Sequence, residues 1–300
     1  MRARFILAVT LPMLAGYTPA AFGSASCGII PGTNGFNRAL SFHQALTNHE
    51  PTAPPDIFVS VISSVLRNDA PGAMKKLSIA YQTKTKPEDR AEIAYWAAKT
   101  SDIAGNKKQS QQFLAMAATI SDSFYGQLAG TTQPANVGKY PLQYFRYIDP
   151  RTDYALVWAV IRQESRFHTK SISPAGALGL MQVIPQTAQA VTKAFGSPLN
   201  QSRMLQDPHY AVAIGSTWLG YLYNKYNHNI PLTLAAYNGG ELCADKWSKF
   251  IGDPRETSTN TLLWIESIPY DETRNYIKGV LTNYVIYRQA TKSHINLPTK

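Results

Sequence analysis

Apolar residues recur three or four positions apart through most of the chain, which is the spacing of helices that bury one face. The pattern begins near residue 56 and breaks once, at Pro71 and Gly72. Two further helices are expected at 87–104 and 107–119. Their apolar positions match as in a packed antiparallel pair, with Ile93, Trp96 and Ala97 on the first and Phe113, Leu114 and Ala117 on the second.

Start signals for helices are clearer after residue 140. Asp149–Pro150 and Asp207–Pro208 each combine an N-cap residue with a proline at the first helical position. No stretch of the sequence shows the alternation or the turn residues of a β-hairpin. We therefore expect an all-α fold.

The N-terminus has the layout of a secretory signal peptide. Arg2 and Arg4 precede an apolar run too short to span a bilayer comfortably, and small residues follow up to Ala25. The alternative is a lipid anchor on Cys27, although Ser24 stands where such signals carry an aliphatic residue. We expect export to the periplasm after cleavage of residues 1–25.

The remaining chain divides by composition. Residues 26–55 are rich in Gly, Pro, Asn and Thr and are expected to be largely irregular, apart from one short helix around 37–47. Residues 56–130 form the helical-pair domain, and a polar stretch around 131–140 separates it from a second helical domain at 140–300. No fixed-period repeat is present.

Charge and composition exclude little by themselves. The net charge of +10 is spread along the 300 residues, which suits an anionic polymer such as nucleic acid or cell wall. The two cysteines, Cys27 and Cys243, have no metal-ligand spacing, and their pairing stays open. The six histidines form no metal-binding motif and no glycine loop for phosphate occurs, so no metal and no cofactor is expected.

One carboxylate continues an apolar stripe. Tyr154, Val157, Trp158 and Ile161 share one face of the helix expected after Asp149, and Glu164 lies three residues further on. A carboxyl group in line with a buried face is desolvated, which raises its pKa toward that of a general acid at neutral pH. An exposed glutamate at a fraying helix end is the alternative, and the stripe alone does not decide between them.

Three later segments bear on that choice. They read SPAGALGLMQ at 173–182, AAYNGG at 235–240 and WIESIPYDETR at 264–274. With the Glu164–Ser165 pair, their order and spacing resemble the lysozyme-like catalytic domain of the soluble lytic transglycosylases. The resemblance covers residues 140–290 strongly. Upstream it is weaker and implies a truncated superhelical stack, too short to close a ring.

The resemblance implies a role for particular residues. Glu164 is the single catalytic acid and base, and the Tyr237 hydroxyl lies near its carboxyl group. Glu266 lies in the substrate groove, with a structural salt bridge as the alternative. The substrate-binding residues implied are Ser165, Ser173, Gly179, Met181, Gln182, Tyr237, Asn238 and Glu266.

The implied activity is cleavage of the β-1,4 bond between N-acetylmuramic acid and N-acetylglucosamine, with formation of 1,6-anhydromuramyl ends. Peptidoglycan glycan strands are then the partner rather than nucleic acid, with peripheral association with the outer membrane or a secretion apparatus as a further expectation. A lysozyme-like hydrolase and a non-catalytic wall-binding scaffold are the alternatives. The sequence leaves open whether cleavage is internal or terminal, and what the oligomeric state is.

Overall fold

Fourteen α-helices and two short 3-10 helices make up the computed structural model, which describes residues 26–47, 49, 56–131 and 137–293. Within these residues no strand forms, and Leu178 takes part in two isolated β-bridges. The all-α expectation is confirmed. The helices are α1 (Asn34–Leu46), α2 (Ile57–Leu66), α3 (Ala70–Thr83), α4 (Pro87–Ile103), α5 (Lys107–Ala118), α6 (Phe124–Leu128), η1 (Val137–Lys139), η2 (Phe145–Tyr147), α7 (Tyr154–Ser165), α8 (Pro185–Ala194), α9 (Gln201–Gln206), α10 (Pro208–Lys225), α11 (Ile230–Gly239), α12 (Glu241–Ile251), α13 (Thr261–Ser267) and α14 (Asp271–Ser293).

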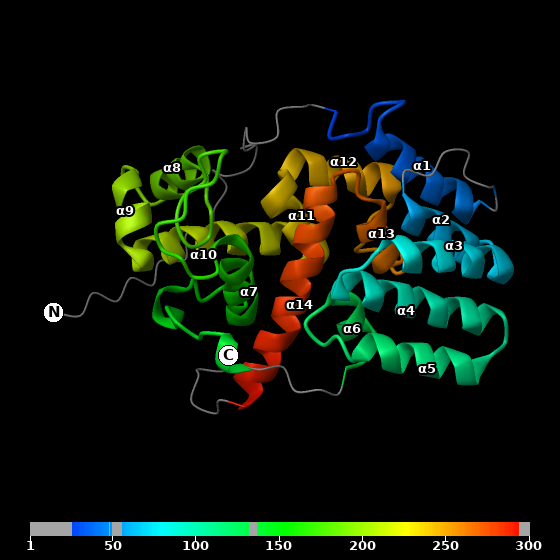
Figure 1. Ribbon diagram of the computed structural model, residues 1–300. Helices are drawn as coiled ribbons and strands as arrows, with labels where there is room; N and C mark the ends of the chain where they lie inside the picture. Colours follow the sequence, from blue (N-terminus) through cyan, green and yellow to red (C-terminus); the bar gives the residue numbers. More distant parts are fainter. Residues whose placement is uncertain (1–25, 48, 50–55, 132–136, 294–300) are drawn as a thin grey trace.

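The long helix α14 runs between two groups of helices (Figure 1). On one side it packs against α7 and α11, within a core that contains Trp158, Trp247 and Trp264. On the other side it contacts α6, whose Tyr125 belongs to a separate core formed mainly by α2 to α6. Because α14 touches both groups, it joins the helical stack of α2 to α6 to the group around α7 and α11, which the sequence predicts to be catalytic and which is called the catalytic lobe below.

The α4–α5 pair forms as the apolar spacing predicts. Both helices end within one residue of the expected bounds, and they pack closely against each other. Gly105 makes the turn between them with a φ of +75°, a left-handed conformation that glycine adopts without strain. Ile93, Trp96 and Ala117 share one hydrophobic core, so local periodicity was sufficient to define this unit.

One helix start differs from the prediction. Helix α10 begins as expected, with the Asp207 side chain accepting hydrogen bonds from its first turn. Helix α7, however, is capped by Asp153 and not by Asp149. The Asp149 carboxylate instead accepts bonds from the backbone and guanidinium groups of Arg151, so it is not available to cap a helix.

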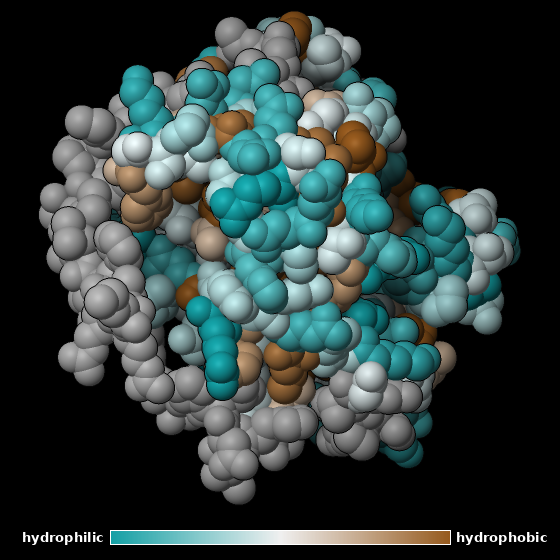
Figure 2. Space-filling model, turned by 90° about the vertical axis from the view of Figure 1, so that its left-hand side faces the viewer, coloured by the Kyte–Doolittle hydropathy of each residue, from teal (hydrophilic) through white to brown (hydrophobic). Residues whose placement is uncertain are grey.

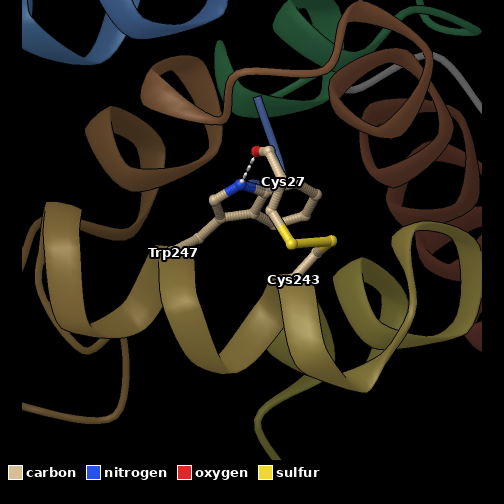
Figure 3. Close-up of a disulfide and its surroundings, with 3 residues drawn as sticks. All are labelled: Cys27, Cys243 and Trp247. Carbon is tan, nitrogen blue, oxygen red and sulfur yellow. Dashed lines mark hydrogen bonds between the residues drawn. A yellow bond between two sulfur atoms is a disulfide. The ribbon is translucent and has the colours of Figure 1, made fainter. Parts of the chain in front are cut away.

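The N-terminal segment is tied to the catalytic lobe by a disulfide. Cys27 is bonded to Cys243 of α12 across a sequence separation of 216 residues, and the Trp247 indole donates to the Cys27 carbonyl oxygen at 2.9 Å (Figure 3). The sequence left this pairing open. The same segment carries α1, which begins three residues before the short helix expected around 37–47 and ends one residue before the expected end.

Several expectations fall outside the described residues. The predicted signal peptide at 1–25 lies there, as do residues 48 and 50–55 and the middle of the polar stretch between the two predicted domains.

The face that bears α8 and α9 is mostly hydrophilic, with separate small hydrophobic patches (Figure 2). Among the helices that the structure describes, none is both long and apolar enough to cross a membrane.

Candidate active site

A cavity of about 250 Å³ lies where the end of α7 meets the loop before α8, the end of α11 and the start of α14. Its walls combine hydroxyl, amide and carboxyl groups with small apolar side chains. It is lined by Glu164, Ser173, Ala175, Ala177, Gln182, Val183, Ile184, Thr187, Trp218, Tyr237, Asn238, Gly239, Gly240 and Glu272. The cavity therefore unites residues from the Glu164–Ser165 pair and from all three later segments found in the sequence.

Glu164 lies in the last turn of α7, after a run of buried residues from Ala155 to Ile161, and is itself partly exposed. The backbone turns away directly afterwards, because Arg166 and Phe167 both adopt left-handed conformations. Burial raises the pKa of the Glu164 carboxyl group from 4.5 to about 8. The nearby Tyr276 hydroxyl opposes this shift of the pKa, and the negative charge of Glu272 adds to it.

The causes of this pKa shift include no cation that would stabilise the charged form of Glu164. The group is therefore protonated at neutral pH while it faces a cavity. This combination is the one that a general acid needs, because a proton must be held until a leaving group arrives and then released.

The loop before α8 contributes Ser173 and Gln182. The Ser173 hydroxyl accepts a hydrogen bond from the Ala177 backbone at 3.0 Å, which closes the first turn of the loop. Gln182 has a φ of +48°, and its amide donates to the carbonyl oxygens of Ser171 and Gly179. Gln182 thus has a fixed orientation at the cavity wall, as a substrate-positioning residue requires.

The end of α11 contributes Tyr237 and Asn238. The Tyr237 hydroxyl donates to the Met181 carbonyl oxygen at 2.8 Å. Burial raises the pKa of Tyr237, and the negative charge of Glu164 raises it further. Tyr237 and Glu164 line the same cavity, and the hydrogen bond of the Tyr237 hydroxyl goes to Met181. The Asn238 side chain accepts from the Thr273 hydroxyl at 2.7 Å, which joins α11 to α14.

Three predicted substrate-binding residues stand behind the cavity wall. The buried Ser165 hydroxyl donates to the carbonyl oxygens of Ile161 and Leu180. Gly179 has a φ of +71°, and a Cβ atom there would lie 2.2 Å from the Met204 carbonyl oxygen, so the glycine permits backbone packing rather than contact with a sugar. The Met181 side chain is buried against Gly215.

Glu266 is corrected from a groove residue to a buried ion-pair residue. Its side chain is 0% exposed and forms salt bridges with Arg38 and Lys278, both at 3.0 Å. The Tyr125 hydroxyl donates to the same carboxylate at 2.8 Å. The salt-bridge alternative considered from the sequence is the one observed, because α1 and α6 cover this position from the stack side.

Two residues of α14 were missed from the sequence. Glu272 lines the cavity. Tyr276 is buried, and the charge of Glu164 is among the causes that raise the pKa of Tyr276. Glu272 lies in the same WIESIPYDETR segment as Glu266, so the motif pointed to the correct region but the wrong glutamate was chosen. A helix periodicity argument could have found Tyr276, because it lies one turn after Glu272.

Metal ligation has no support in the part of the chain that the structure describes, where no group of three or more His, Cys, Asp or Glu side chains is arranged around one point. The cavity can hold a proton on Glu164 and offer amide and hydroxyl groups to a polar ligand.

Comparisons with known proteins find two regions of this chain that match described families. Residues 148–258 match the family described as Transglycosylase SLT domain, and residues 267–294 match the Soluble lytic transglycosylase helical domain. The soluble lytic murein transglycosylase of Escherichia coli strain K12 is 37% identical over 131 residues, which cover 43% of this chain and 20% of that protein. A putative soluble lytic murein transglycosylase of Haemophilus influenzae is 32% identical over 138 residues, covering 46% of this chain and 22% of that protein.

Solved structures share the fold. An inactive mutant of the lytic transglycosylase Slt from Pseudomonas aeruginosa matches with a TM-score of 0.62 and 19% identity, over 86% of this chain and 57% of that chain. The 70 kDa soluble lytic transglycosylase of Escherichia coli matches with a TM-score of 0.51 and 18% identity, over 88% and 52% of the two chains. The chain spans about a fifth of the length of the two murein transglycosylases from Escherichia coli strain K12 and Haemophilus influenzae. The chain therefore contains a Transglycosylase SLT domain at residues 148–258, followed at residues 267–294 by a match to the Soluble lytic transglycosylase helical domain.

Proposed function

We propose that this chain is a peptidoglycan lytic transglycosylase that cleaves the β-1,4 bond between N-acetylmuramic acid and N-acetylglucosamine without water. One observation carries the proposal: the Glu164 carboxyl group faces a polar cavity with a pKa raised by burial to about 8. At neutral pH it is therefore an acid in its protonated form. The family supplies the substrate class, and the relatives' names describe murein as their substrate.

The proposed reaction uses Glu164 twice. Glu164 first donates its proton to the glycosidic oxygen, the bond from that oxygen to C1 of the muramyl residue breaks, and the muramyl acetamido oxygen bonds to C1. The resulting Glu164 carboxylate then removes the proton of the C6 hydroxyl, and O6 displaces the acetamido oxygen at C1. The product is a 1,6-anhydro ring, and Glu164 is protonated again.

A lysozyme-like hydrolase is the second candidate, and Glu272 is the observation that favours it. Ordinary glycosidases use two carboxyl groups that flank the scissile bond. Glu272 lines the same cavity as Glu164 and is exposed, so it could activate a water molecule. The two candidates differ in product, because water yields reducing ends and the C6 hydroxyl yields anhydro ends.

Mass spectrometry of the fragments released from purified sacculi separates the two reactions. The wild-type protein is expected to release anhydromuramyl fragments, and Glu164→Gln is expected to lose about 10²- to 10⁴-fold in rate. Glu272→Gln is expected to keep the anhydro product. Reducing ends from the wild type, lost in Glu272→Gln, would establish the hydrolase instead.

Binding to insoluble cell wall tests the third possibility, a scaffold without activity. A scaffold predicts that wild type and Glu164→Gln sediment equally with sacculi and that neither reduces their turbidity. The transglycosylase predicts equal sedimentation, with turbidity loss for the wild type alone. A wild-type rate from Glu164→Gln would overturn the assignment of the acid.

We further propose that the chain is exported and works in the periplasm. The composition of residues 1–25 supports this, as does the disulfide, because such bonds persist in oxidising compartments. The Cys27 sulfur that forms the disulfide is not free to carry a lipid thioether, so association with the outer membrane or a secretion apparatus would be peripheral. Cell fractionation and intact mass under non-reducing conditions test both points, and a lipid adduct on Cys27 would contradict them.

A further inference from the structure

A second cavity lies at the end of the catalytic lobe farthest from the helical stack, where α8, α9 and the start of α10 meet (Figure 1). Its volume is about 260 Å³, close to the 250 Å³ of the cavity at Glu164. Among the described residues, none lines both cavities. The acid-base reaction above therefore gives this second cavity no role.

The two cavities lie at successive turns of one pair of helices. Thr187 of α8 and Trp218 of α10 line the cavity at Glu164, whereas Val191 and Ile214 line the second cavity. In each helix the two positions are four residues apart, so they share a face and are separated by about 6 Å along the axis. The second cavity is thus within reach of a strand whose cleaved bond lies at Glu164.

Apolar and aromatic side chains make up most of this cavity. Val191 and Ile214 are buried beneath it, and the Phe195 side chain borders it while 52% exposed. The Tyr210 ring is held in place by the Arg203 guanidinium, which lies 4.3 Å from the ring centroid. Aromatic rings with one exposed face offer a large, rigid contact area to the C–H face of a sugar ring.

Polar groups at the rim are available to a neutral ligand. The Asn200 side-chain oxygen accepts from the Arg203 backbone at 3.2 Å, which leaves the Asn200 amide N–H groups without a described partner, and the Ser197 hydroxyl has none either. The Tyr210 hydroxyl accepts from the Asn200 backbone at 3.3 Å and keeps its own proton to donate. Arg203 is the one charged residue lining the cavity among those described, and it is already paired with Asp207 at 2.6 Å. The rim therefore suits hydroxyl and amide groups better than an anion.

We propose that the second cavity binds an N-acetylglucosamine residue of the glycan strand, away from the bond that is cleaved. The choice of this sugar rests on the transglycosylase function. N-acetylglucosamine is neutral, its ring can pack on Phe195, and its acetamido group offers a methyl group to the apolar base and a carbonyl oxygen to the rim. Such a contact is the same before and during the reaction, so it strengthens binding of long strands without changing the chemical step.

Phe195→Ala tests the proposal, and Phe250→Ala is its matched control. Phe250 is also exposed, at 45%, but it packs on Phe36 and lines neither cavity. We expect Phe195→Ala to raise KM on long glycan strands about 3- to 10-fold with kcat changed less than about twofold, since one aromatic contact contributes an amount of this order. Phe250→Ala should keep both constants. Ala213→Leu, which fills the cavity from α10, should act like Phe195→Ala.

Methyl NMR follows binding without cleavage. In the Glu164→Gln protein, chitotriose, a soluble oligomer of N-acetylglucosamine, should shift the signals of Val191 and Ile214. Adding Phe195→Ala should abolish these shifts, while any shift of Val183 in the cavity at Glu164 should remain. Unmoved Val191 and Ile214 signals, or shifts that survive Phe195→Ala, would overturn the proposal. Shifts caused by hexanoate but not by chitotriose would assign the cavity to an acyl chain and overturn it too.

This binding test does not depend on the reaction product. If the wild type forms no anhydro ends while chitotriose still shifts the Val191 and Ile214 signals, the proposed function fails and the sugar site stands. If anhydro ends form and these signals do not move, the sugar site alone fails.

Discussion

Glu164, which is partly exposed, and Glu266, which is fully buried, show how the same side chain can be prepared for different work. Glu164 faces the cavity of the catalytic lobe, and Glu266 lies at the junction with the helical stack. Burial raises the pKa of Glu164 to about 8, and no cation opposes it. Burial acts on Glu266 in the same direction, but Lys278 and Arg38 outweigh it and hold its pKa below the usual value.

The difference teaches that burial alone does not define a catalytic acid. A buried carboxyl group with cationic partners stays charged and contributes to structure, whereas one without them keeps its proton. Glu92 beside the junction shows that one nearby cation is not sufficient. Burial is the largest cause and raises the pKa of Glu92, as does the negative charge of Glu266, although Lys278 lowers it.

The largest expected effect on stability is at the junction. Glu266→Gln leaves Arg38 and Lys278 buried without their carboxylate, which should lower the free energy of unfolding by about 3–5 kcal/mol. Urea denaturation measures this change. The exposed Glu256→Gln is the matched control, with an expected change within about 0.5 kcal/mol. Equal stability of the two variants would show that the junction cluster is not structural.

The disulfide should have the next largest effect. Replacing Cys27 and Cys243 with serine removes a crosslink between the segment that carries Arg38 and helix α12, and typical losses are about 2–4 kcal/mol. Thermal unfolding of the wild type with and without reductant should show the same loss. A reductant-insensitive wild type would contradict the bond.

Replacing Glu164 should change stability less than the two changes above, and it should stabilise the folded protein. Its folded pKa of about 8 exceeds the ordinary 4.5, so between these pH values the unfolded state releases a proton that the folded state keeps. Stability of the wild type therefore falls as pH rises through this window. Glu164→Gln avoids the loss and should be more stable by about 0.5–2 kcal/mol at pH 8, with no gain below pH 4. A gain that is equal at both pH values would disprove the burial account.

The sequence predicted features that depend on neighbours along the chain. The α4–α5 pair follows from apolar spacing, and the cap at Asp207 follows from its Asp–Pro signal. The same signal at Asp149 was misleading, because Arg151 two residues later binds the carboxylate. Local motifs also brought Glu164, Gln182 and Tyr237 to one cavity.

Features that depend on distant partners could not be predicted. Glu266 and Glu272 belong to one motif, but Glu266 is buried in an ion pair and Glu272 lines the cavity. The ion pair of Glu266 depends on Arg38, which lies 228 residues before it. Gly179 likewise owes its conformation to the Met204 carbonyl oxygen rather than to a ligand. The pairing of Cys27 with Cys243 is of the same kind, since no spacing rule connects residues so far apart.

The most direct test is the titration of the Glu164 carboxyl group in the substrate-free protein. Carbon-13 NMR of glutamate-labelled protein, with Glu164→Gln to assign the signal, follows that carboxyl group from pH 3 to pH 10. A midpoint near pH 8 is predicted, because burial without a cation holds the proton. A midpoint near the ordinary value of 4.5 would contradict the claim that this site keeps a general acid ready at neutral pH.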